Sequence, residues 1–452
     1  MRKFHDLSPD PSSHIKTLMR IGYTLPSAVA DIIDNSIAAN STQIQILSPP
    51  GMDRPIISIL DNGDGMSEEE LVSNMRIGCK DPLAERRKGD LGRFGSGMKT
   101  ASFSQARRLT VITKKEGYSI VAAIWDIDVI ERENSWALEV IKGNAIGDIH
   151  HLKIDENTHH GTQIIWEGLS CISAGNHISN LDEELAAQLV NVKSHIALYF
   201  HRFLKGRDHK EIYLNGSLIE PIDPFLTGVD GYQEGREERF RCKGGFVQIK
   251  THVLPHIKRI PEPELTRLGG ADGISRNQGI YIYREGRLIN AGGWLGLATN
   301  NQLGALARVQ VDIPSSLDHE WSTDVKKSSL QLPSRVKKEL KKYLSDPIER
   351  SKRAYTYRGN QDTANQYWTV CENKNDKKVT YHIDPENEKL IAILKATPAE
   401  YRVELIKYLT EVSSSIPVNH IYQKMSESPK DVQQDTVNSS VFESILDKIF
   451  KD

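Results

Sequence analysis

The residue of this sequence best placed to recognise a ligand is a carboxylate at the end of an apolar run. Asp61 follows residues 55–60 (PIISIL), whose β-branched side chains predict a short buried strand. Gly63 and Gly65 come next, before Met66, and let the backbone approach a flat ligand closely. An aspartate in this setting can accept a hydrogen bond from an exocyclic amine, such as that of adenine. The pattern also fits an ordinary strand–Asp–Gly turn, so its meaning depends on other segments.

Residues 25–39 predict an amphipathic helix, with Pro26 in its first turn and apolar residues at helical spacing. Asp31 and Asn35 are four residues apart, so they lie one above the other on the opposite face. That face is either a solvated polar surface or the lining of a nucleotide site. In a nucleotide site, Asn35 would give an oxygen to Mg²⁺, which prefers oxygen ligands, and Asp31 would orient or deprotonate water.

A glycine-rich segment at residues 92–100 (GRFGSGMKT) predicts a phosphate-binding turn that opens a helix, through backbone N–H groups and the helix dipole. A P-loop is excluded because Met98 separates Gly97 from Lys99, and a dinucleotide fold because the preceding residues 83–90 are charged rather than strand-like. A mobile phosphate lid of roughly fifteen residues, from about Gly78 to Gly97, fits better. The candidate phosphate-binding residues are Gly92, Arg93, Phe94, Gly95, Ser96, Gly97, Met98 and Lys99.

Gly161 and Thr162 form a turn that enters a predicted strand at residues 161–166. The Thr162 hydroxyl could meet the adenine edge beside Asp61, although threonine at the start of a strand is often only a β-former.

Taken in order, these four segments resemble the ATP site of the GHKL superfamily. That group comprises gyrase-type topoisomerases, large heat-shock chaperones, sensor histidine kinases and MutL, with the MORC ATPases as relatives. The resemblance covers roughly residues 10–200 and rests on four motifs rather than one. It implies a Bergerat-type two-layer α/β sandwich that binds ATP and Mg²⁺, with Asp31 catalytic and Asn35 on the metal. Hydrolysing members usually have Glu where Asp31 stands, so we expect ATP binding with slow turnover.

A second domain is expected further along the chain. The polar residues 226–238 predict a loop. Strand-like runs follow at 245–249, 279–284, 287–289 and 307–313, and a helix at 333–344. This order is similar to the transducer domain of MutL, gyrase and MORC. Within that resemblance, residues 324–327 (DVKK) are similar to the loop whose lysine reaches the γ-phosphate, which assigns that catalytic role to Lys326, with Lys327 as the alternative.

The expected fold class is therefore α+β in three domains. Residues 1–210 form the ATP-binding domain, residues 211–352 a transducer-like α/β domain, and residues 353–452 a small mixed module. In that module, residues 355–366 predict a linker, residues 367–370 and 378–383 a hairpin, and residues 388–394, 401–409 and 441–450 helices.

Composition is that of a cytoplasmic protein without a targeting or membrane-spanning segment: of 452 residues, 38% are hydrophobic and 26% charged. The net charge of −2 means that any contact with nucleic acid must be a local patch. Histidine pairs at 150–151 and 159–160 lack partners at ligand spacing, so we expect turn or solvated histidines. The four cysteines lie too far apart for a zinc or disulfide framework (Cys79, Cys171, Cys242 and Cys371).

The function follows by elimination within the resemblance. Histidine kinases normally carry their phosphoacceptor helices before the ATP domain, and the chain offers neither a nuclease metal motif nor room for topoisomerase machinery. We expect an ATP-hydrolysing switch or clamp of MORC/MutL type, acting in DNA transactions such as antiviral (anti-phage) defence. It would form an ATP-dependent homodimer and act with partner proteins encoded nearby. The alternative is a protein-remodelling chaperone of the heat-shock type.

Overall fold

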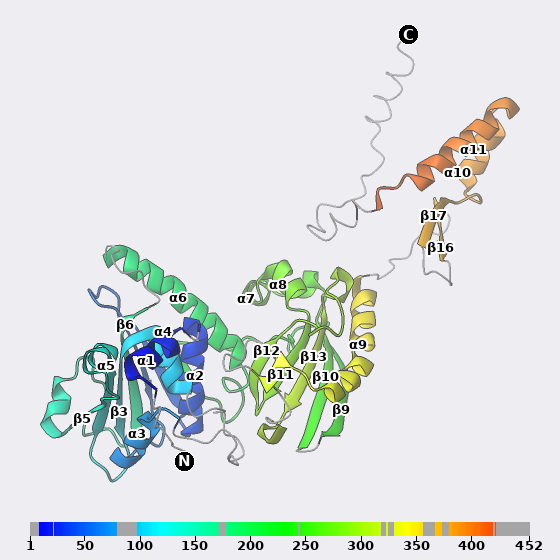
Figure 1. Cartoon of the computed structure of the whole chain (residues 1–452). Helices are drawn as coiled ribbons and strands as arrows, with labels where there is room; N and C mark the ends of the chain where they lie inside the picture. The colour runs from blue at the N-terminus through cyan, green and yellow to red at the C-terminus, as the bar shows by residue number, and fades with distance from the viewer. Residues whose placement is uncertain are drawn as a thin grey trace, which may run out of the picture. The chain divides into compact units, whose positions relative to one another are not determined.

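The computed structural model describes residues 9–20, 22–78, 97–170, 178–242, 245–317, 322–323, 330–355, 367–372, 379–418 and 421. The chain divides into two compact units, Met1–Tyr355 and Thr356–Asp452. The first unit contains two large sheets, and the second contains a hairpin and two helices (Figure 1).

An eight-stranded sheet with the order β5-β4-β3-β6-β2-β1-β7-β8 organises the N-terminal half of the first unit. All neighbouring strands are antiparallel except β1 and β7, which are parallel. The strands are β1 (Gln43–Leu47), β2 (Ile56–Asp61), β3 (Ala106–Lys114), β4 (Val121–Asp126), β5 (Glu139–Lys142), β6 (Gly161–Leu169), β7 (Glu211–Leu214) and β8 (Ser217–Leu218).

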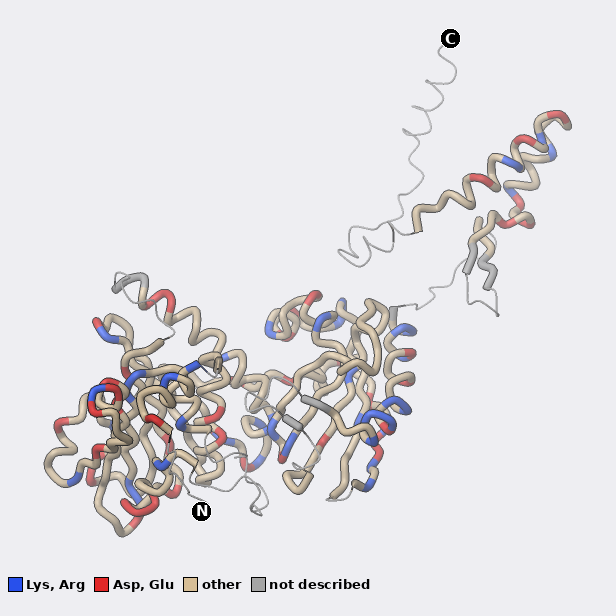
Figure 2. Tube along the Cα trace, viewed as in Figure 1, with Lys and Arg blue, Asp and Glu red and all other residues tan. Residues whose placement is uncertain are grey.

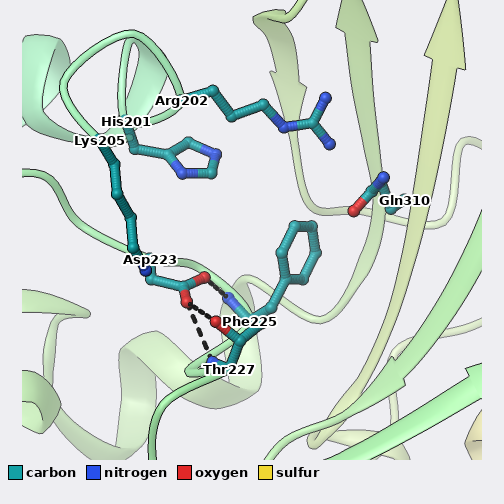
Figure 3. Close-up of a pocket in the computed structure, with 7 residues that line it drawn as sticks. All are labelled: His201, Arg202, Lys205, Asp223, Phe225, Thr227 and Gln310. Carbon is teal, nitrogen blue, oxygen red and sulfur yellow. Dashed lines mark hydrogen bonds between the residues drawn. The ribbon is translucent and has the colours of Figure 1, made fainter. Parts of the chain in front are cut away.

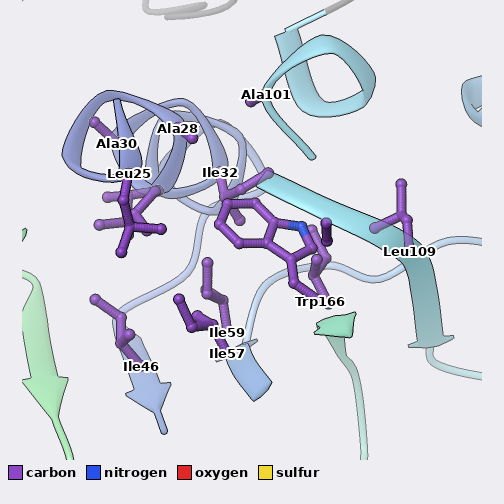
Figure 4. Packing of buried hydrophobic residues seen from close by; sticks show 14 of the residues in the cluster. Leu25, Ala28, Ala30, Ile32, Ile46, Ile57, Ile59, Ala101, Leu109 and Trp166 are labelled. Carbon is purple, nitrogen blue, oxygen red and sulfur yellow. The ribbon is translucent and has the colours of Figure 1, made fainter. Parts of the chain in front are cut away.

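Helices cover one face of this sheet, and the main core lies between the two layers (Figures 1 and 4). Alternate strand residues such as Ile57, Ile59 and Trp166 point into this core, whereas Ile56 and Ile165 belong to a smaller cluster formed with other residues. The Trp166 indole donates a 2.9 Å hydrogen bond to Ser102 of α4, which satisfies its polar atom. The helices are α1 (Pro11–Met19), α2 (Leu25–Ala38), α3 (Glu68–Met75), α4 (Gly97–Gln105), α5 (Ile127–Glu133) and α6 (Ile178–Tyr199), with a 3₁₀ helix at Gly143–Asp148.

Helix α2 has the expected proline and apolar face, and it also has an N-terminal cap that was not predicted. Thr24 and Ser27 form a capping box, and Pro26 occupies the first turn. The buried face of the helix includes Ile32 and Ile33, which pack on the sheet. Packing therefore fixes which polar side chains of α2 are left on the outside.

A five-stranded sheet with the order β12-β11-β13-β10-β9 forms the second half of the first unit. Its strands are β9 (Gln233–Cys242), β10 (Gly245–Val253), β11 (Gly279–Arg284), β12 (Arg287–Ala291) and β13 (Ala307–Ile313). Helix α9 (Ser334–Tyr355) packs on this sheet through Val336, Leu340 and Leu344. The remaining elements are α7 (Glu262–Arg267), α8 (Gly270–Arg276), 3₁₀ helices at Ile257–Arg259, Gln302–Gly304 and Ser315–Leu317, and the short pair β14 (Ser322–Thr323) and β15 (Leu330–Gln331).

The second unit pairs β16 (Trp368–Glu372) with β17 (Val379–Ile383), followed by α10 (Glu388–Ala396) and α11 (Ala399–Ser414). These elements agree with the hairpin and the first two helices expected there. The third helix, expected at 441–450, lies outside the described residues.

The α+β fold class is confirmed. One element prediction is wrong in part: residues 233–238 belong to β9 rather than to a loop, because backbone pairing with β10 stabilises a strand with few apolar residues. The domain boundary at residue 210 stays a prediction, and the first sheet continues to Leu218 of β8. No described helix is long and apolar enough to cross a membrane.

Candidate functional site

Asp61 ends β2 in a buried position where its carboxylate already accepts hydrogen bonds. The Ser36 hydroxyl of α2 donates to Oδ2 at 2.7 Å, and the Gly63 backbone N–H donates to Oδ1 at 2.9 Å. Burial raises the pKa of Asp61 above its usual range, and these hydrogen bonds oppose that shift. The Asp61 carboxylate is thus held in a fixed orientation and can accept a further hydrogen bond from a ligand.

Thr162 lies beside Asp61 on the next strand, and Thr113 lies beside Thr162 on the strand after that. Thr162 of β6 is the register partner of both Asp61 on β2 and Thr113 on β3. The Thr113 and Thr162 hydroxyls are 3.2 Å apart, and the Met66 backbone N–H donates to the Thr113 hydroxyl at 2.9 Å. The sheet register therefore brings together the predicted residues Asp61, Thr162 and Met66, which come from separate segments.

The glycines of this site are required by close backbone contacts. Gly65 has φ +66°, and a Cβ at this position would lie 1.8 Å from the Lys114 carbonyl oxygen. A Cβ on Gly63 would lie 2.7 Å from the Ala39 carbonyl oxygen, and one on Gly161 would lie 2.4 Å from that of Asp61. No side chain fits in these three places, so the turn after β2 stays close to α2 and β3.

Asp31 lies on α2 near the start of α4. The Tyr23 hydroxyl donates to its Oδ2 at 2.9 Å, which holds the carboxylate in one orientation. A Cβ built on Gly97 would lie 3.3 Å from the same oxygen, so the first residue of α4 approaches Asp31 closely. The N-terminus of α4, where backbone N–H groups favour an anion, is therefore beside the carboxylate proposed to act on water.

Asn35 is exposed on α2, one turn after Asp31. Its amide oxygen is an acceptable ligand for Mg²⁺, and a metal bound through one protein oxygen would take its other ligands from water and phosphate. Within the described ranges, no group of three or more His, Cys, Asp or Glu side chains could hold a metal.

The glycine-rich segment is described only from Gly97 onward. Met98 is partly buried against the core, and the buried Lys99 donates from Nζ to the Asn74 carbonyl oxygen at 2.6 Å. The remaining predicted phosphate-binding residues (Gly92, Arg93, Phe94, Gly95 and Ser96) and the transducer lysines Lys326 and Lys327 lie outside the described residues. Their roles remain predictions, as do those of the described site residues.

Three residues of the site were not predicted: Ser36, Thr113 and Tyr23. Ser36 could have been found, because it follows Asn35 on the predicted helix. Thr113 and Tyr23 could not, since their contacts depend on strand register and on the loop before α2. The predicted turn histidine His160 has a role too, because its Nδ1 lies 2.8 Å from the Gly63 carbonyl oxygen.

The polar groups gathered at this site fit an adenine nucleotide with a divalent cation. A buried acceptor, two hydroxyls and a glycine turn could hold the base, and Asn35, Asp31 and the start of α4 could face the metal and phosphates. Bound Mg²⁺ would neutralise phosphate charge, and Asp31 would be placed to orient an attacking water.

Comparison with known proteins agrees with this geometry. Residues 23–162 match the family model described as histidine kinase-, DNA gyrase B-, and HSP90-like ATPase. The chain is 29% identical over 91 residues to ATPase morc-1 of Caenorhabditis elegans, and 30% identical over 92 residues to ATPase MORC2B of Mus musculus. Each match covers 20% of this chain but only 10% and 9% of the respective relative. Residues 23–162 therefore match a GHKL-type ATPase domain, and the chain is similar at low identity to two MORC ATPases.

Proposed function

We propose that this protein is a MORC/MutL-like molecular switch or clamp that binds ATP with Mg²⁺, hydrolyses it slowly, and acts on DNA as a homodimer with partner proteins. Anti-phage defence is the setting we propose for this activity. The observation that carries the proposal is the buried Asp61, held by Ser36 and Gly63 at the end of β2.

Slow hydrolysis follows from the carboxylate available to act on water. Asp31 is one methylene shorter than Glu, and its Oδ2 is already bonded to the Tyr23 hydroxyl. A general base near the attacking water contributes about 10²–10⁴-fold in rate, and a badly placed one contributes less. Measurable phosphate release in the presence of Mg²⁺, abolished by Asp31→Ala, would support this part of the proposal.

The DNA part is supported by a basic surface on α9. Its apolar stripe packs on the second sheet, while Lys337, Lys338 and Lys341 are exposed. Figure 2 shows where Lys and Arg occur along the chain, including this helix. These three lysines form no ion pair with any residue in the described ranges, unlike Lys342, which lies 2.7 Å from Glu339. Cations at this spacing can follow a phosphate backbone, and they need no positive charge on the whole molecule.

A gel-shift experiment tests the DNA part directly. The parent should retain duplex DNA more strongly with a non-hydrolysable ATP analogue than without nucleotide. Lys337→Glu combined with Lys341→Glu should weaken retention and reduce the slope of log K against log [salt] by about 2. The matched control, Lys395→Glu with Lys407→Glu, removes two exposed lysines of α10 and α11 and should bind as the parent does.

Other outcomes would refute the DNA proposal. DNA retention that is equal in the parent and the α9 variant would remove α9 from the interface. Failure to retain DNA, together with nucleotide-dependent holding of an unfolded client protein, would favour the chaperone alternative.

A further inference from the structure

A buried ion pair joins the helix of the candidate ATP site to the second sheet. Arg287, the first residue of β12, donates from Nε to Oδ1 of Asp34 on α2 at 2.9 Å. The two side chains are only 6% and 4% exposed and are separated by 253 residues in the sequence. Buried charges of this kind are stable only when each has its partner, so the pair fixes a specific relation between the two elements.

The remaining surface of the Arg287 guanidinium is also occupied. Its Nη1 donates to the Tyr199 carbonyl oxygen at 3.4 Å, and its carbon lies 3.9 Å from the ring centre of Phe200. Tyr199 ends α6, and Phe200 directly follows it. Arg287 therefore has little rotational freedom, and it can act as a fixed point for α2.

Asp34 lies between the two α2 residues assigned to the nucleotide. Asn35 is the next residue, and Asp31 is one turn earlier on the same helix. Ser36, two residues after Asp34, donates a hydrogen bond to Asp61. A rotation of α2 about its axis would therefore move the metal ligand and the water-orienting carboxylate together.

We infer that Arg287 is a positioning residue for the ATP site: through Asp34, it sets the rotation of α2 that presents Asp31 and Asn35 to the phosphates and metal. This inference rests on the proposed function. It makes the second sheet part of the machinery for hydrolysis and metal binding. Asp61 ends β2 and keeps its hydrogen bond from Gly63 whatever the rotation of α2, although its bond from Ser36 comes from that helix.

The main test replaces both charges at once. In Asp34→Leu/Arg287→Met the buried pair becomes apolar, a change that commonly leaves folding intact. Without the directional bond, kcat should fall at least about tenfold, since small misplacement of reacting groups is costly. The Mg²⁺-dependent gain in affinity for a non-hydrolysable ATP analogue should fall by a similar factor. The Kd for ADP without metal should stay within about threefold of the parent value, which corresponds to less than about 1 kcal/mol.

Conservative variants keep the test decisive if the double variant does not fold. Asp34→Asn keeps an acceptor for Arg287, and Arg287→Lys keeps the charge but loses the planar donor. Arg287→Lys keeps both charges and should fold, whereas Asp34→Asn should be less stable than the parent because the Arg287 charge loses its counter-charge. The folded protein of each variant should give kcat values between those of the parent and a variant without the pair, with metal-free ADP affinity unchanged.

A second ion pair of the same region provides the matched control. Arg202 pairs with Asp312 of β13 beside a cavity of about 260 Å³, also lined by His201 and Gln310 (Figure 3). Neither Arg202 nor Asp312 has a described contact with α2. Arg202→Met/Asp312→Leu should therefore keep the kcat and the Mg²⁺-dependent affinity of the parent.

The outcomes separate the inference from the proposed function. Parent-like kcat and Mg²⁺-dependent affinity in Asp34→Leu/Arg287→Met would overturn the positioning role. An equal loss in the Arg202→Met/Asp312→Leu control would also overturn it, because the effect would then belong to the whole region. A parent protein that does not bind metal-free ADP would instead refute the proposed function, and the inference with it.

Discussion

At the scale of single residues, the site holds a carboxylate in surroundings that disfavour its charge, and a bound nucleotide would donate a hydrogen bond to that carboxylate. Asp61 is a buried carboxylate whose pKa is raised by desolvation. Ser36 and Gly63 each donate a hydrogen bond to this carboxylate, and these two bonds do not fully replace hydration. A ligand amine would donate a further hydrogen bond. The charge of Asp61 therefore favours nucleotide binding but lowers the stability of the ligand-free protein.

Asp61→Asn should therefore stabilise the ligand-free protein while weakening nucleotide binding. A raised carboxyl pKa gives stability that is complete below the unfolded-state value of about 4 and is lost as pH rises through the folded-state pKa. Removing the charge should raise the melting temperature at pH 7 by roughly 2–4 °C, a gain that shrinks toward pH 4. ATP affinity should fall about tenfold to a hundredfold. Thermal melts across pH and calorimetry measure the two effects, and a variant that melts below the parent at pH 7 would contradict this account.

Asp31 and Asn35 should separate hydrolysis from metal binding. Asp31→Ala should keep nucleotide affinity and reduce phosphate release toward the lower end of the about 10²–10⁴-fold that a general base contributes, because this carboxylate is short and already bonded to Tyr23. Asn35→Ala should abolish the effect of Mg²⁺ on binding or turnover, because the metal loses its protein oxygen. Phosphate release and calorimetry with and without Mg²⁺ measure both. Undiminished turnover in Asp31→Ala would show that this carboxylate takes no part in the reaction.

At the scale of elements, local sequence patterns predicted individual helices and strands. The pairing of strands that are far apart in the sequence could not be predicted. The apolar run before Asp61 predicted β2, and Pro26 with the apolar residues at helical spacing predicted α2. The register that places Thr113 beside Thr162 could not be predicted, because it depends on the pairing of β3 with β6. The strand β9 was missed for a similar reason: it is mostly exposed and charged, and its pairing with β10 holds it in the sheet.

The turn between β2 and α3 should be intolerant of a side chain. Gly65→Ala must adopt a left-handed conformation and move the end of β3, since its Cβ would meet the Lys114 carbonyl oxygen. Gly51 is the control: it has φ +74° with nothing within 4 Å of an added Cβ, so Gly51→Ala carries only the backbone cost of about 1–2 kcal/mol. Gly65→Ala should lower the melting temperature more than Gly51→Ala and should also reduce nucleotide affinity. Equal effects of the two substitutions on melting and binding would show that the close contact at Gly65 is unimportant.

At the scale of the whole molecule, ATP can drive a conformational change only through contacts that it makes better in one state than in the other. The predicted contact is between the γ-phosphate and Lys326, with Lys327 as the alternative. ADP lacks this phosphate and cannot make the contact. The proposed clamp should therefore distinguish the two nucleotides by its oligomeric state.

A non-hydrolysable ATP analogue, but not ADP, should shift the protein toward a dimer. Lys326→Ala should weaken that shift and leave ADP affinity unchanged, with Lys327→Ala as the comparison that identifies the lysine. Light scattering at several protein concentrations measures the mass. The same mass with analogue, with ADP and without nucleotide would rule out an ATP-gated dimer.

The central claim is that Asp61 reads the amine of adenine, and a calorimetric comparison of ATP with inosine triphosphate tests it most directly. The two nucleotides have the same phosphates and sugar, but inosine triphosphate carries a carbonyl oxygen in place of the amine. The parent should bind ATP at least about tenfold more tightly, since a hydrogen bond to a charged group contributes about 1.5–3 kcal/mol, and Asp61→Asn should lose most of this preference. Equal affinity of the parent for the two nucleotides, or a preference that survives in Asp61→Asn, would contradict the account.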